Sequence, residues 1–119
     1  MAGKKAQVGW KATLRVHLTR KDAHYSGGLV AGAKILELFG DAATQLCLRE
    51  AGVEGLFRAY EVVDFFVPVY AGDKLQVTAT ITRIGRTSRR MSFEATKIKP
   101  GEVVARAIGT VVIPELTQN

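Results

Sequence analysis

The sequence has almost no cysteine, since Cys47 is the single thiol among its 119 residues. One cysteine excludes a disulfide framework and is typical of a reducing compartment, so we expect a cytoplasmic protein. Leucines flank Cys47 on both sides, which favours a small buried hydrophobic role for it. No apolar run approaches the roughly twenty residues of a membrane span. The basic start MAGKKAQVGWK is not followed by the apolar segment of a secretory signal.

Acidic residues are also in deficit, with 11 Asp and Glu against 17 Lys and Arg, for a net charge of +6. Such a surface attracts nucleic acid or a small polyanionic ligand, or is simply well solvated. The chain lacks the interleaved aromatic platform of single-strand binders and any recognisable DNA-reading motif. Nucleic acid is therefore the weaker expectation, and with two histidines and one cysteine no metal site is expected.

The chain does contain one long helical pattern with strands around it. Alternating apolar residues predict a strand at 12–18, and three- and four-residue spacing predicts a helix from Leu29 to Ala51 that stops at Gly52. Further strands are predicted at residues 56–66, 73–84, 89–98 and 102–113, with turns at GRTS and KPGE.

Short turns imply antiparallel neighbours, and one very apolar helix needs a sheet to cover it. The expected fold is therefore α+β, a five-stranded antiparallel sheet wrapped around one long central helix in a single domain. Residues 1–11 and 114–119 are expected to be flexible ends. The last strand is apolar on both faces, so that whichever face is outside leaves an apolar patch and argues for a partner subunit. The two sets are Val103, Ala105, Ala107 and Val111, and Val104, Ile108 and Val112.

Five segments carry a resemblance to a known family: DAHYSGGLVAGAK, LELFGDAATQL, GLFRAYEVVDFFVPVYAGD, GRTSRRMSFEATK and RAIGT. In order and spacing they resemble the hotdog-fold superfamily over roughly residues 12–113, and most of all its β-aminoacyl-CoA ammonia-lyases, which act on 3-aminobutyryl-CoA or β-alanyl-CoA. The resemblance implies an acyl-CoA substrate, no further cofactor, and a homodimer or a larger assembly of dimers. It also implies active sites at the dimer interface, built from the loop and N-terminus of the central helix.

The chain departs from the lyase pattern at three places. Where the lyases have Gly-Asn-Leu-Val-Asn/Asp-Gly-Ala, it has GGLVAGA, and where they have Gly-Asp-x-x-Thr-Glu, it has Gln45 in place of the glutamate. The lyases also carry an insertion between the last two strands, where this chain has only the turn KPGE. These losses leave an acyl-CoA thioesterase as the alternative, in which a carboxylate activates water or attacks the thioester. A non-catalytic acyl-CoA sensor is a third possibility.

The stretch DAHYSGGL, just before the predicted helix, has more polar groups than a helix cap needs. Gly27 and Gly28 would let a thioester approach free amides around Leu29, where N–H groups and the helix dipole stabilise an oxyanion. A plain glycine turn is the alternative.

Elimination also needs an acid and a base at the same place. On the loop the candidates are Asp22, which could instead tie down the loop, His24, and Tyr25, which could instead be an aromatic anchor. On the helix, Asp41 lies inside the matched GDAAT segment and is the preferred carboxylate, with Glu37 second. The alternative for both is a solvated polar stripe.

A basic cluster, RIGRTSRR, surrounds the turn between two predicted strands. Guanidinium groups match phosphate oxygens well, so this turn is expected to bind the phosphates of coenzyme A. The residues expected to do so are Arg83, Arg86, Ser88, Arg89 and Arg90.

Overall fold

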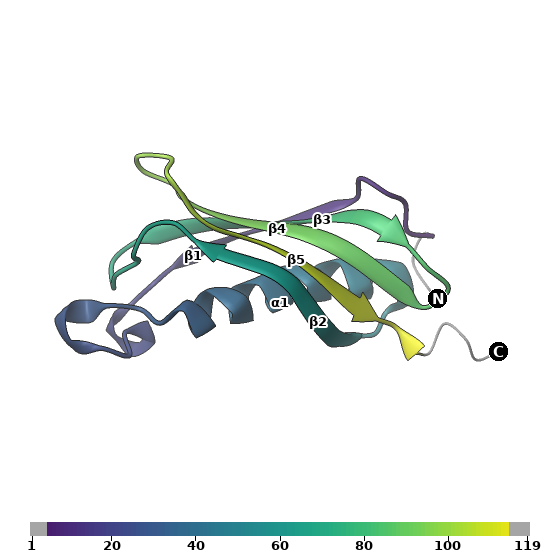
Figure 1. The fold of residues 1–119 in the computed structure, drawn as a ribbon, viewed down its shortest axis with the longest axis horizontal. Coiled ribbons are helices and arrows are strands. Elements are labelled where there is room, and N and C mark those ends of the chain that lie inside the picture. Colours follow the sequence, from purple (N-terminus) through teal and green to yellow (C-terminus); the bar gives the residue numbers. More distant parts are fainter. Residues whose placement is uncertain (1–4, 115–119) are drawn as a thin grey trace.

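The computed structural model describes residues 5–114, which form one long helix, five strands and two short 3-10 helices (Figure 1). In chain order the elements are β1 (Lys11–His17), η1 (Arg20–Asp22), η2 (Ser26–Gly28), α1 (Gly32–Ala51), β2 (Leu56–Phe65), β3 (Lys74–Ile84), β4 (Ser88–Lys97) and β5 (Val103–Val112).

The five strands form one antiparallel sheet in the order β1-β3-β4-β5-β2. The sheet curves around α1, which lies along its concave face (Figure 1). β1 and β2 are the two edge strands of this sheet. The predicted fold, a curved antiparallel sheet around one central helix, is confirmed. No helix within residues 5–114 is both long enough and apolar enough to cross a membrane.

The core lies between α1 and the inward side chains of the sheet. Full burial of each large apolar side chain contributes about 1.5–3 kcal/mol. Cys47 is 1% exposed, and burial raises the pKa of its thiol to about 11, so its predicted role as a buried hydrophobic residue is confirmed. The buried side of α1 is made of Ile35, Leu38, Phe39, Ala42, Ala43, Leu46, Cys47 and Glu50.

α1 begins three residues later than the periodicity predicts. The amide of Val30 donates to the carbonyl of Val69 at 2.8 Å, and Leu29 forms an isolated bridge with Tyr70, so these residues are extended. Apolar spacing alone does not distinguish such a short paired segment from a first helical turn. The predicted stop at Gly52 is confirmed, because that residue is left-handed and its amide donates to the carbonyl of Leu48.

The exposed apolar surface lies on β2, not on β5 as predicted. Val104 is only 1% exposed, because a register shift where β4 pairs with β5 turns it inward. Ile108 and Val112 are half-buried. By contrast, Val62 of β2 is 45% exposed and Phe65 is 51% exposed.

Part of the N-terminal segment that the sequence predicts to be flexible contacts the rest of the protein. Ala6 is buried, Trp10 packs against the core, and the amide of Gly9 donates to the carbonyl of Ile81 at 2.8 Å. The flexibility of the chain ends stays a prediction. Residues 1–4 and 115–119 lie outside the described part of the chain.

Candidate active site

The start of α1 presents backbone donors that the helix itself does not use. The first amides of a helix have no acceptor within it, and its dipole places partial positive charge there. At this helix the amide of Lys34 is already bonded to the carbonyl of Ala31, at 3.0 Å. Among the described residues, the amides of Gly32 and Ala33 have no such partner. They are suited to hold a carbonyl oxygen that becomes negative.

Gly27 and Gly28 lie in η2, before α1 rather than in its first turn. Both have a left-handed backbone, with φ of 76° and 80°, which explains why glycine occupies these positions. Leu29 does not open the helix, and its carbonyl accepts the amides of His24 and Tyr25, at 3.1 Å each. Of the amides predicted to be free, that of Val30 is taken by Val69, whereas that of Leu29 has no acceptor among the described residues. Thioester binding by Leu29 and by the η2 glycines stays a prediction.

An apolar hollow of about 270 Å³ adjoins the helix start. The ring of Phe65, at the end of β2, rests against Gly32, so that a Cβ there would meet the ring at 2.8 Å. The hollow is open beside this contact and has no charged group in its wall. Its lining is Val30, Gly32, Ile35, Phe65, Val67, Pro68, Val69 and Val104.

Lys34 brings together two of the predicted carboxylates. Its Nζ lies 3.3 Å from Oδ1 of Asp22 and 3.3 Å from Oε1 of Glu37. The other oxygen of Asp22 accepts the amide of Thr19 at 2.7 Å, in a capping box around η1. Asp22 therefore ties the entrance loop to the first turns of α1, the second of the two readings that the sequence left open.

The pKa shifts in this cluster follow from these bonds. The amide of Thr19 is the main cause that lowers the pKa of Asp22, and Lys34 adds to it. Burial opposes the charge on Lys34, but its bonds to Glu37 and Asp22 outweigh burial and raise its pKa. Both groups are thus held ionised at neutral pH, and neither is poised to exchange a proton there.

The remaining candidates, His24, Tyr25 and Asp41, are exposed to solvent. His24 and Tyr25 stack edge to face, with ring centroids 4.6 Å apart. Asp41 lies one turn beyond Glu37 on α1 and has no ion pair or side-chain hydrogen bond to any described residue. A carboxylate that is exposed and uncommitted can accept a proton from a substrate. The structure therefore leaves His24 and Asp41 available and does not assign their roles.

Tyr60 was not singled out from the sequence. It reaches from β2 to α1, where its hydroxyl donates to the carbonyl of Leu36 at 2.9 Å. Burial raises the pKa of Tyr60 to about 12. Its ring stacks on Phe57 with centroids 4.3 Å apart. Tyr60 thus fixes the edge strand to the helix, and no local pattern would have identified this contact across 24 residues.

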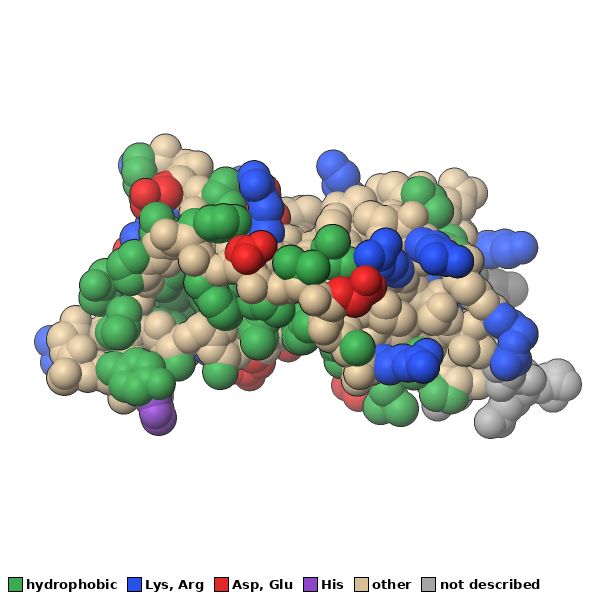
Figure 2. All heavy atoms as spheres, viewed as in Figure 1, with side chains coloured by type: hydrophobic (Ala, Val, Ile, Leu, Met, Phe, Trp, Pro, Cys, Tyr) green, Lys and Arg blue, Asp and Glu red, His purple; other side chains and the backbone are tan. Residues whose placement is uncertain are grey.

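The predicted phosphate-binding turn lies at the opposite end of α1. Lys and Arg side chains gather over this end of the visible face (Figure 2). Arg83, Ser88 and Arg90 line a hollow of about 450 Å³ there, joined by Arg58, which the sequence analysis did not select. Arg90 is bound to Glu61 through its Nε, at 2.8 Å, and the hydrogen bond from Arg90 lowers the pKa of Glu61.

Arg86 is exposed at the tip of the turn, but Arg89 is 5% exposed and bound inside the protein. Its guanidinium bonds Glu50 with two nitrogens and two backbone carbonyls with the third. The guanidinium is thus engaged mainly inside the protein, which favours an internal role for Arg89. Its contact with a phosphate stays a prediction. Its register on β4 turns it toward the helix, whereas its neighbours Ser88 and Arg90 face outward.

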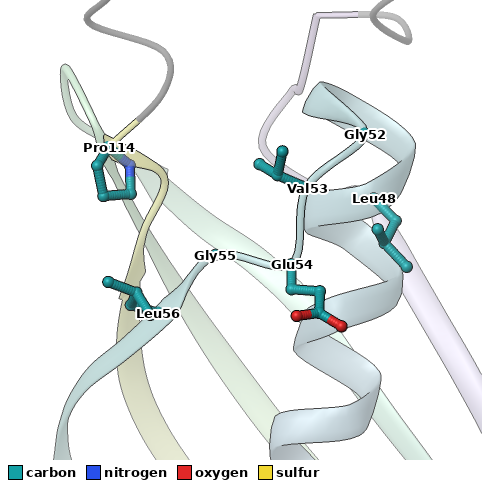
Figure 3. A pocket seen from close by; sticks show the side chains of 7 residues that line it. All are labelled: Leu48, Gly52, Val53, Glu54, Gly55, Leu56 and Pro114. Atoms are coloured by element: carbon teal, nitrogen blue, oxygen red, sulfur yellow. The ribbon is translucent and has the colours of Figure 1, made fainter.

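A further hollow, of about 520 Å³, lies between the C-terminal end of α1 and the start of β2 (Figure 3). Among the described residues that line it, Glu54 is the one with a titratable side chain. Leu48 and Leu56 contribute exposed apolar surface, at 41% and 61%. This hollow is continuous with the exposed edge strand β2, and none of the predicted catalytic residues line it. Within residues 5–114 no cluster of His, Cys, Asp and Glu could hold a metal ion.

Comparison with known proteins adds independent evidence. A family model described as thioesterase superfamily matches residues 27–104. The chain is 45% identical, over 124 aligned positions, to a 3-aminobutyryl-CoA ammonia lyase of Acetoanaerobium sticklandii, and the alignment covers 92% of this chain and 98% of that protein.

Solved structures show the same relationship. A β-alanyl-CoA:ammonia lyase from Clostridium propionicum superposes with a TM-score of 0.85 at 31% identity, covering 90% of this chain and 87% of that one. A hexameric broad-specificity acyl-coenzyme A thioesterase superposes with a TM-score of 0.75 at 22% identity, over 92% and 83% of the two chains. The second likeness shows a shared fold.

Proposed function

The chain belongs to the thioesterase superfamily, and from this membership we propose that it catalyses the reversible elimination of ammonia from a short β-aminoacyl-CoA. One structural observation carries the proposal. The free amides of Gly32 and Ala33 open beside a small apolar hollow, on a helix that also carries two exposed carboxylates, Glu37 and Asp41. The names of the two lyase relatives support the same substrate class.

The proposed reaction follows from thioester chemistry. A base removes the proton on the carbon next to the thioester carbonyl, and the carbonyl oxygen gains negative charge. The electron pair then forms the carbon–carbon double bond, the carbon–nitrogen bond breaks, and the protonated amine leaves as neutral ammonia. Fixed amides at a helix start stabilise the charged oxygen, and such donors contribute about 3–4 kcal/mol each. The substrate needs no further cofactor for these steps.

We propose Asp41 of the partner subunit as the base, because nine residues of helix, about 13 Å, separate Asp41 from Gly32 within one chain. His24 is proposed as the second proton-handling group. Asp41 is uncommitted, whereas the carboxylate of Glu37 is held by Lys34. Glu37 then helps to hold Lys34, and Lys34 keeps the entrance loop against the helix through Asp22. The apolar hollow beside Gly32 would receive the end of a short acyl chain.

A homodimer would complete the site. β2 pairs with β5 on one side, and its other edge has no partner strand among the described residues. It also carries exposed apolar side chains, and natural proteins usually cover such an edge. It starts beside the end of α1, where Gly55 contacts Cys47, and ends against Gly32. If two copies of β2 pair antiparallel, the phosphate-binding turn of one subunit approaches the helix start of its partner. One coenzyme A thioester could then bind the turn of one subunit and the helix start of the other.

The acyl-CoA thioesterase is the second candidate, because Gln45 replaces a carboxylate of the lyase pattern. One assay separates the two. The protein is mixed with crotonyl-CoA and ammonium, and enoyl absorbance and free thiol are followed together. Loss of absorbance without thiol release supports the lyase, and thiol release supports the thioesterase. If neither changes, both proposals fail. We expect the enzyme to work in the cytoplasm.

A further inference from the structure

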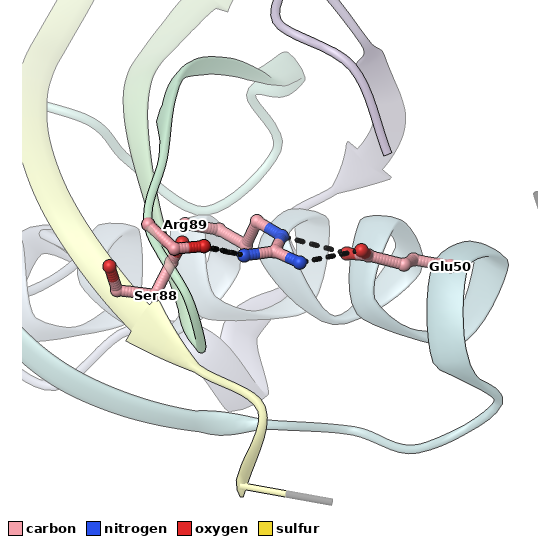
Figure 4. A network of polar contacts seen from close by, with 4 residues as sticks. Glu50, Ser88 and Arg89 are labelled. Carbon is pink, nitrogen blue, oxygen red and sulfur yellow. Dashed lines mark hydrogen bonds and ion pairs between the residues drawn. The ribbon is translucent and has the colours of Figure 1, made fainter. Parts of the chain in front are cut away.

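The last turn of α1 and the turn between β3 and β4 are joined by a buried ion pair (Figure 4). Nε of Arg89 lies 2.9 Å from Oε1 of Glu50, and Nη2 lies 2.7 Å from Oε2. The two residues are 5% and 7% exposed. This is a bidentate pair, whose planar geometry fixes orientation as well as distance.

The same guanidinium also holds both ends of the turn. Nη1 of Arg89 donates to the carbonyl of Gly85 at 3.0 Å and to that of Ser88 at 2.7 Å. The amide of Gly85 closes the turn by donating to the carbonyl of Ser88 at 2.9 Å. One side chain on a strand therefore fixes the shape of the turn, and Glu50 fixes that side chain.

This arrangement occupies three of the four carbonyls of the turn and leaves two of its amides free. The carbonyls of Gly85 and Ser88 point inward to Arg89, and that of Thr87 accepts the amide of Ile113 at 2.8 Å. In the described part of the chain, the amides of Arg86 and Thr87 have no hydrogen-bond acceptor. Successive free amides in a turn form an anion-binding concavity. The adjoining hollow, which Gly85 and Ser88 of the turn help to line, also contains three arginines and one acidic residue, Glu61.

We propose that Glu50 and Arg89 are positioning residues for phosphate binding: they do not touch the ligand, but hold the turn at residues 85–88 in the shape that receives a phosphate group of coenzyme A. The inference rests on the proposed function, which supplies the coenzyme A thioester. A Lys at position 89 would keep the charge beside Glu50, but its single ammonium cannot bond the carboxylate in two places and both carbonyls.

The test compares a ligand with phosphates and one without. Arg89→Lys and Glu50→Gln are assayed with crotonyl-CoA and with crotonyl-pantetheine, which lacks the nucleotide and its phosphates. For each variant we expect the KM for crotonyl-CoA to rise about tenfold with kcat little changed, since one charge-assisted hydrogen bond is worth that factor. Turnover of crotonyl-pantetheine should stay within about twofold of the parent, because it does not use the turn.

Val77→Ala is the matched control, since this buried residue of β3 lies outside the turn. This variant should have a lower melting temperature. Its activities on crotonyl-CoA and crotonyl-pantetheine should change by the same factor. Equal losses on both substrates in Arg89→Lys and Glu50→Gln would overturn the proposal, because general destabilisation produces that result. If one variant does not fold, judged by circular dichroism, the other decides.

Calorimetry with coenzyme A keeps this inference separate from the proposed reaction. If the parent binds coenzyme A but turns over no substrate, the proposed function fails, and a tenfold weaker Kd in Arg89→Lys still supports positioning. If the parent does not bind coenzyme A, or the variant binds it equally well, the positioning role is wrong.

Discussion

The ring of Phe65, at the end of the edge strand β2, lies directly on the backbone of Gly32, the first residue of α1. A Cβ at position 32 would lie 2.8–3.3 Å from three ring carbons. Half of the Phe65 side chain is exposed. The contact joins the proposed oxyanion donors to the strand that we propose pairs with a partner subunit.

Gly32→Ala should therefore displace this ring. Overpacking of this kind costs about 1–3 kcal/mol of unfolding free energy, measured by urea denaturation. Adding Phe65→Ala should restore part of the loss, since the methyl group then has room. A double-mutant cycle with coupling near zero would show that the ring moves away freely.

Phe65→Ala by itself should shift the preference for acyl length. The hollow beside Gly32 is apolar and about 270 Å³ in volume, and this ring forms one of its walls. Each buried methylene is worth about 0.8 kcal/mol, so room for two more should raise kcat/KM for hexenoyl-CoA relative to crotonyl-CoA about tenfold. Val67→Ala, elsewhere in the same wall, is the comparison. An unchanged ratio in Phe65→Ala would place the acyl chain outside this hollow.

Removal of the proposed base should abolish most activity without loss of structure. Asp41→Asn is expected to lower kcat for ammonia addition by about 10²–10⁴-fold, the usual contribution of a general base. Gln45→Ala, one turn further on the exposed side of α1, should change kcat little. If Glu37→Gln loses far more activity than Asp41→Asn, the roles of the two carboxylates are reversed.

The link from Asp22 to Lys34 should make stability depend on pH in a defined way. The pKa of Asp22 is lowered from 3.8 in the folded state, so its contribution is present above that value and is lost as pH falls through the folded pKa. The pKa of Lys34 is raised from 10.5, so its contribution is lost as pH rises above that value. Asp22→Asn should thus lower the melting temperature at pH 7, and its difference from the parent should shrink as the pH falls below 3.8. A difference that stays constant across this range would contradict the assignment.

A charge on the edge strand should separate the subunits of the proposed dimer. Val62 is 45% exposed in the middle of β2, and Val62→Asp would bury a carboxylate in any interface there. Light scattering should then give the mass of one chain, while circular dichroism stays unchanged. If the active site uses both subunits, separating them should also lower the activity. Arg106→Asp, on the neighbouring β5 where the side chain is exposed, is the control.

Much of the architecture follows from the sequence alone, because it depends on local periodicity. The alternation of Leu75, Val77 and Ala79 has to place one face of β3 in the core, and the spacing along α1 has to bury one side of the helix. Short turns between the strands then leave few topologies. The order of the motifs also indicates the right superfamily.

The site depended on contacts between distant residues, and these only the tertiary structure decided. The helix begins at Gly32 and not, as its periodicity predicts, at Leu29, because Val30 pairs with Val69, which lies far along the chain. In the RIGRTSRR cluster, the sequence shows four arginines of equal charge. Strand register then turns Arg89 inward to Glu50, 39 residues away, while leaving its neighbours outside. Periodicity determines which residues can be buried, but only the packing of separate elements determines which charged groups meet.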